Sequence, residues 1–170
     1  MSKYLPYGEA KFLTPEEAAW IVEEFTERKG AGLRADSDHG WYVECDLVID
    51  PEMHSFFASY PPLPAKRKIE RKDYSRHTRG LVDAYGMNQT ALSSSEKLVG
   101  DLDEKKNYRL HYLYLKEVLF HGVRLKSISR VVQFRQSPWL RSYILDNNEQ
   151  RRIHGHDPFA KSFWKLMNNR

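Results

Sequence analysis

The sequence predicts an α+β fold, because patterns typical of helices and of strands interleave along its 170 residues. The length corresponds to one domain, and a hydrophobic content of 41% is enough to form a core. Neither an internal repeat nor a low-complexity segment is present.

The clearest helix begins near Thr14. Thr14 can cap it, Pro15 suits the first helical position, and Glu17 completes a capping box. An apolar face follows at helical spacing, and Gly30 is expected to end the helix. Residues 41–50 then alternate as a strand, with one face formed by Val43, Cys45, Leu47 and Ile49.

The middle of the chain favours irregular structure. The prolines of residues 60–64 favour an extended loop, which continues into a strongly basic run. Residues 74–85 could form a short helix, and residues 93–104 have the composition of a loop with a turn.

The remainder becomes regular again. We expect a strand at 108–112, a helix that ends at 121–122 and a strand at 125–134. Residues 139–169 indicate two helices, joined at 154–158.

Composition and charge exclude several classes of protein. No apolar run is long enough to cross a membrane, no secretory signal is visible, and one cysteine rules out a disulfide framework, so we expect an intracellular protein, nuclear or cytoplasmic. The net charge of +4 divides into −7 for residues 1–60 and +11 for residues 61–170. A basic, aromatic-rich majority fits contact with nucleic acid, although composition alone favours a solvated lysine-rich surface.

Several groups could carry chemistry, each with a simpler interpretation. Glu44 with Asp46, and Asp101 with Asp103, could each supply half of a two-metal site, or could be a strand edge and an acidic loop. The run from His154 to Asp157, with His111 and His121 at a distance, resembles a metal-ligand cluster but favours a hydrogen-bonded loop. Cys45 is expected to be a buried structural thiol.

The last predicted helix carries the strongest candidate. Lys161 and Lys165 are four residues apart, so their ammonium groups share a helix face. With Arg151 and Arg152 they could neutralise a polyphosphate, or they could form a solvated basic face.

Two runs in this region resemble the protein-primed family B DNA polymerases of viruses, linear plasmids and Polinton/Maverick-type transposable elements. They read FRQSPWLRSYI at 134–144 and FAKSFWKLMNN at 159–169. Earlier runs agree in order: LPYG at 5–8, GWYVECDL at 40–47, YPPLPA at 60–65 and YRLHY at 108–112. The resemblance covers nearly the whole chain.

The resemblance implies an organisation and a function. Residues 1–58 would be a palm-like helix and strand, 59–106 a proline-rich and basic insertion, 107–136 a strand–helix–strand of the palm, and 137–170 the beginning of the fingers helices. Lys165 would contact the phosphates of the incoming deoxynucleoside triphosphate, assisted by Lys161, and Asn169 would be the asparagine of the same motif. Contacts with template-primer DNA, and with a terminal priming protein, would involve the basic insertion and the fingers, where the candidate DNA-binding residues are Lys66, Arg67, Lys68, Arg71, Lys72, Arg151 and Arg152.

The chain also departs from the family pattern. Both aspartate motifs that would bind Mg²⁺ should lie outside residues 1–170, and Arg170 stands where the nucleotide motif has a small residue. We therefore expect an internal polymerase fragment, between the first and second polymerase motifs, that is inactive alone. Two alternatives remain: a stand-alone, non-enzymatic nucleic-acid-binding protein derived from such a polymerase, and a small nuclease that uses Asp101 and Asp103.

Overall fold

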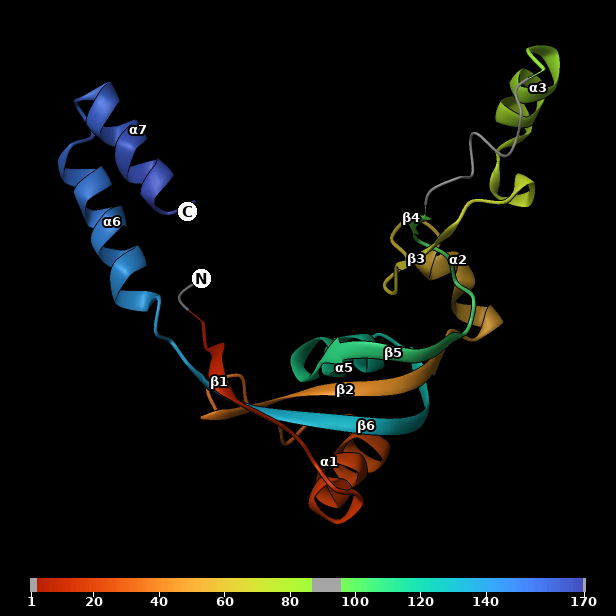
Figure 1. The fold of residues 1–170 in the computed structure, drawn as a ribbon, viewed down its shortest axis with the longest axis horizontal. Coiled ribbons are helices and arrows are strands. Elements are labelled where there is room, and N and C mark those ends of the chain that lie inside the picture. The colour runs from red at the N-terminus through yellow and green to blue at the C-terminus, as the bar shows by residue number, and fades with distance from the viewer. Residues whose placement is uncertain (1–2, 87–95, 170) are drawn as a thin grey trace.

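The computed structural model describes residues 3–86 and 96–169, which form an α+β fold. A curled four-stranded antiparallel sheet has the strand order β1-β6-β2-β5 (Figure 1). Its strands are β1 (Leu5–Phe12), β2 (His39–Val48), β5 (Lys105–His111) and β6 (Arg124–Ser137). Helix α1 (Pro15–Arg28) connects β1 to β2, and α5 (Tyr112–Phe120) connects β5 to β6. Each connection joins two parallel strands across one intervening strand, so the unit consists of two interleaved split βαβ motifs.

The core lies between these two helices and one face of the sheet. Ile21 and Phe25 of α1 and Leu115 of α5 are almost fully buried against alternate residues of β2. That face of β2 contains Val43, Cys45 and Leu47, as its alternation predicts. Tyr42, Glu44 and Asp46 therefore lie on the opposite face, which neither α1 nor α5 covers.

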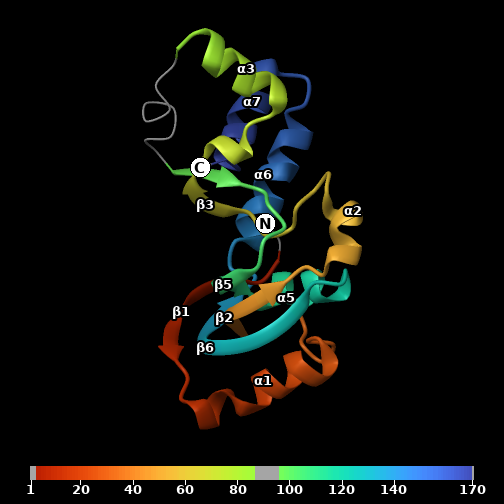
Figure 2. The ribbon, with the colours of Figure 1, turned by 90° about the vertical axis from the view of Figure 1, so that its right-hand side faces the viewer.

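Two arms extend from the sheet (Figures 1 and 2). The first lies between β2 and β5 in the sequence and includes α2 (His54–Phe57), β3 (Ala65–Lys68), α3 (Arg76–Ala84) and β4 (Glu96–Val99). Strands β3 and β4 form a separate antiparallel pair. The second arm follows β6 and is a hairpin of α6 (Arg141–Ile153) and α7 (Pro158–Met167). In the outer part of the first arm, from β3 to β4, and in the second arm, from α6 to α7, Val82 is the only buried hydrophobic residue among those described. Phe57 and Leu63, which precede β3 in the first arm, are also buried.

Most of the predicted elements are present, with local corrections. The Thr14 capping box forms as expected, and α1 ends just before Gly30 as expected: its last residue is Arg28, and both Lys29 and Gly30 have positive φ. The basic run is partly regular, because residues 65–68 form β3. The strand expected at 108–112 begins earlier, at Lys105, and Tyr112 instead begins α5.

Strand β1 was not predicted from the sequence. Of the loop expected at 93–104, residues 93–95 lie outside the described residues, and residues 96–99 form the strand β4 instead. No helix in the described part of the chain is long and apolar enough to cross a membrane.

Candidate functional site

The α6–α7 hairpin is held by contacts at both of its ends. Asp157 caps α7, because its side chain accepts hydrogen bonds from the backbone N–H groups of Phe159 (2.9 Å) and Ala160 (3.3 Å). At the other end the Tyr143 hydroxyl donates to the Met167 carbonyl over 2.9 Å. The Asn168 side-chain amide likewise donates to Asn148 over 2.8 Å. These contacts fix the two helices relative to each other, and therefore also fix the direction of their exposed faces.

That hairpin brings together the predicted nucleotide-contacting residues. Lys161, Lys165 and Asn169 follow one another at intervals of four residues, and all three are exposed. Within residues 3–86 and 96–169, neither lysine forms an ion pair. Their ammonium groups are thus available to an anion from solution.

The two arginines of α6 differ from each other. Arg152 is bound in a bidentate manner by Glu149, with N–O distances of 2.8 and 2.6 Å. Arg151 is half-buried and makes no ion pair with a described residue. The His154–Asp157 segment is the loop between the helices, and Asp157 serves as the α7 cap, which supports its interpretation as a hydrogen-bonded loop.

The basic insertion has much less uncompensated charge than its sequence suggests. Arg67 donates to Asp73 over 2.6 and 2.8 Å and to Asp101 over 3.0 Å. Arg71 pairs with Asp83, and Lys72 pairs with Glu70. Only Lys66 and Lys68 of this run are exposed and make no ion pair with a described residue.

The carboxylate of Asp101 is already bound by two cationic side chains. Lys105 and Arg67 both bind it, and although burial alone would raise its pKa, their hydrogen bonds hold the pKa below its usual value. Asp103 is exposed beside it. A carboxylate already neutralised by two cations is a poor half of a metal pair, so the nuclease alternative receives no support here.

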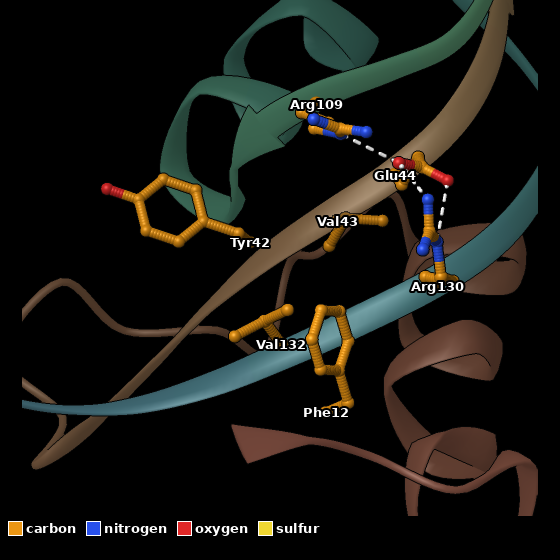
Figure 3. Close-up of a pocket in the computed structure, with 7 residues that line it drawn as sticks. All are labelled: Phe12, Tyr42, Val43, Glu44, Arg109, Arg130 and Val132. Atoms are coloured by element: carbon orange, nitrogen blue, oxygen red, sulfur yellow. Dashed lines mark hydrogen bonds and ion pairs between the residues drawn. The ribbon is translucent and has the colours of Figure 1, made fainter. Parts of the chain in front are cut away.

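The other carboxylate pair lies on the open face of the sheet, where Glu44 is held between two arginines (Figure 3). Arg130 donates to it over 2.9 and 3.0 Å, and Arg109 donates over 2.7 Å. These hydrogen bonds, those of Arg130 first, lower the pKa of Glu44 to about 2. Asp46, on the same face, accepts from the Asn107 N–H and from the Ser127 hydroxyl. Both side chains share a face as predicted, but each is already engaged.

Beside Glu44 the sheet face contains a hollow of about 310 Å³, lined by Phe12, Tyr42, Val43, Glu44, Arg109, Arg130 and Val132. Sequence reasoning missed this site, apart from Glu44. Cys45 points the other way into the core, and burial raises the pKa of its thiol to about 12, as expected for a structural cysteine.

Comparison with known proteins gives no relative for this chain. No protein-family profile, no curated protein and no solved structure matches it.

Proposed function

We propose that the chain is an internal section of a protein-primed family B DNA polymerase, and that α7 contacts the phosphates of the incoming deoxynucleoside triphosphate. The observation that carries this proposal is the arrangement of Lys161 and Lys165 four residues apart at exposed positions of α7, with exposed Asn169 just beyond the end of the helix. An extended triphosphate requires several cations directed from one rigid element, and the capped, interlocked hairpin provides one.

The order of the elements supports the same assignment. A sheet covered by helices would form part of the palm, and the hairpin that follows β6 would form the beginning of the fingers. The section between β2 and β5 would be the insertion. There the candidates for contact with DNA, or with a priming protein, reduce to Lys66 and Lys68, because Arg67, Arg71 and Lys72 are paired internally.

In this proposal the residues of the chain bind and orient the nucleotide. Mg²⁺ would accompany the triphosphate, and its aspartate ligands would come from segments of the polymerase outside residues 1–170. The ammonium groups of Lys161 and Lys165 would neutralise phosphate charge that is present before transfer and on the departing pyrophosphate.

Lysine labelling tests the proposal directly. Pyridoxal 5′-phosphate forms an imine with accessible lysines, borohydride reduction fixes it, and peptide mass analysis locates it. We expect dATP with Mg²⁺ to protect Lys161 and Lys165 from labelling, whereas deoxyadenosine, which has no phosphate, does not. Lys68 is the internal control, because it is exposed and without an ion pair but lies on the other arm.

Equal labelling of Lys161 and Lys165 with and without dATP would contradict the proposal. If the chain nevertheless bound DNA with an affinity that falls steeply with salt, the alternative of a non-enzymatic nucleic-acid-binding protein would be favoured.

A further inference from the structure

The open face of the sheet has an apolar row that crosses three strands. The pairing of β1 with β6 places Phe12 beside Val132, and the pairing of β6 with β2 places Val132 beside Tyr42. Two of these side chains are aromatic and accessible, since Phe12 is 70% and Tyr42 45% exposed. Aromatic rings in such positions are costly to leave in water, and they offer flat surfaces for stacking.

Two residues farther along β2 and β6, the side chains on the same face are charged. Arg130, Glu44 and Arg109 lie side by side on β6, β2 and β5. The side chains of Arg109 and Arg130 are 75% and 57% exposed, whereas that of Glu44 is only 9% exposed. Two guanidinium groups share one ionised carboxylate, so the cluster has a net positive charge at neutral pH.

The geometry of Arg109 leaves it able to bind a second anion. Its Nε donates to Glu44, and its terminal nitrogens make no hydrogen bond with a described residue. Arg130 is held more firmly, through both Nε and Nη2. Glu44 thus fixes the direction of both guanidinium groups at the edge of the hollow (Figure 3). Arginines held in this way are suited to a phosphate oxygen.

We propose that this open face binds single-stranded nucleic acid. One base packs against Tyr42 and Phe12 over Val132, an adjacent backbone phosphate contacts Arg109 and Arg130, and Glu44 is a positioning residue. Stacking on aromatic side chains together with backbone charge is how proteins bind unpaired strands. A duplex does not fit this arrangement, because its bases are already stacked and paired.

This proposal is independent of the nucleotide contact proposed for α7. The residues lie on the sheet rather than on the hairpin, so Tyr42→Ala should not change the protection of Lys161 and Lys165 by dATP. Either proposal can therefore fail while the other holds.

Fluorescence anisotropy with a labelled single-stranded DNA oligonucleotide tests the stacking contact. We expect Tyr42→Ala and Phe12→Ala each to weaken binding by about tenfold, and Tyr42→Phe to retain it, because the ring remains. The matched control is Phe120→Ala, which removes an aromatic side chain that is 79% exposed at the end of α5. An oligonucleotide of the same length with abasic sites should bind more weakly. Equal binding of the abasic strand, of the duplex or by Tyr42→Ala would overturn the proposal.

The phosphate contact has its own readout. Arg109→Ala should reduce the slope of log affinity against log salt concentration by about 0.7, the value for one phosphate contact on a single strand. Arg34→Ala is the control, because Arg34 is an exposed arginine that pairs with Asp36 and lies outside the sheet. An unchanged slope in Arg109→Ala would contradict the phosphate contact.

Photocrosslinking locates the bound strand on the unmodified chain, so its result does not depend on whether a variant folds. An oligonucleotide that contains 5-iododeoxyuridine, bound to the unmodified chain, should crosslink to the peptides that contain Tyr42 or Phe12. Deoxyadenosine monophosphate should not suppress this crosslink, because a strand contributes several contacts. Crosslinks confined to α7 or to the basic insertion, or suppression by the mononucleotide, would contradict the assignment to a single strand on the sheet.

Discussion

The sheet with α1 and α5 and the α6–α7 hairpin are built in different ways. Three residues of α1 and four of α5 are buried in a continuous core, whereas α7 buries none of its described residues. The hairpin is held instead by a cap and by two hydrogen bonds that join α6 to the end of α7. The stability of the sheet unit therefore rests on packing, whereas the hairpin depends on these hydrogen bonds.

The largest expected difference between the two regions concerns phenylalanine. Phe25→Ala removes a ring that is 1% exposed in the core and should lower the free energy of unfolding by about 3–5 kcal/mol. Phe159→Ala removes a ring that is 79% exposed on α7 and should change it by less than about 0.5 kcal/mol. Urea unfolding followed by circular dichroism measures both. Similar losses in the two variants would show that α7 packs as tightly as α1.

Two glycines give a smaller contrast. A Cβ at Gly40 in β2 would lie 2.6 Å from Cζ of Phe134 and 2.8 Å from Oε1 of Gln136, so Gly40→Ala should destabilise the sheet by about 1–3 kcal/mol. Gly80 lies within α3, where a Cβ meets open space, so Gly80→Ala should stabilise that helix by about 0.5–1 kcal/mol. The same unfolding measurement compares them. Destabilisation by Gly80→Ala would mean that this part of the insertion packs against something.

The smallest expected effect on stability comes from the charge of one side chain on the sheet, Glu44. The pKa of Glu44 is lowered from 4.5 to about 2, so its carboxylate contributes stability above pH 4.5 and loses that contribution as the pH falls toward 2. Glu44→Gln should therefore be less stable than the unmodified chain at neutral pH, and the difference should shrink across this range. Unfolding midpoints measured from pH 6 to pH 2.5 test this. Glu52→Gln is the matched control, because it removes the carboxylate at an exposed position that makes no ion pair with a described residue.

The sequence predicted what depends on local pattern. Thr14 and Glu17 form their capping box because both partners lie within one helical turn, and the alternation of β2 correctly separates its core residues from Tyr42, Glu44 and Asp46. Strand β1 was missed because Pro6 and Gly8 interrupt any alternation, and its pairing with β6 shifts register on both sides of Gly8. Such a strand depends on a partner more than a hundred residues away.

The candidate site likewise has local features that the sequence predicts and long-range features that it does not. The spacing of Lys161 and Lys165 is local, and α7 places them on one side as predicted. The cluster around Glu44 joins three strands, and its register includes a bulge next to Glu44 that no sequence period reveals. The positive charge of the insertion was overestimated for a related reason, because the carboxylates of Asp83 and Asp101 reach Arg71 and Arg67 only through folding.

The alternating chain of Asp73, Arg67, Asp101 and Lys105 has a mechanical consequence. Arg67 belongs to β3 and Lys105 is the first residue of β5, so Asp101 joins the arm to the sheet at the point where the two meet. Lys105 is only 6% exposed, and partly enclosed charges are screened by salt much less than exposed ones. Salt should therefore weaken the ion pairs at this junction less than it weakens the exposed ion pairs elsewhere in the structure. A rise in salt concentration should therefore leave the base of the arm in place against the first residue of β5.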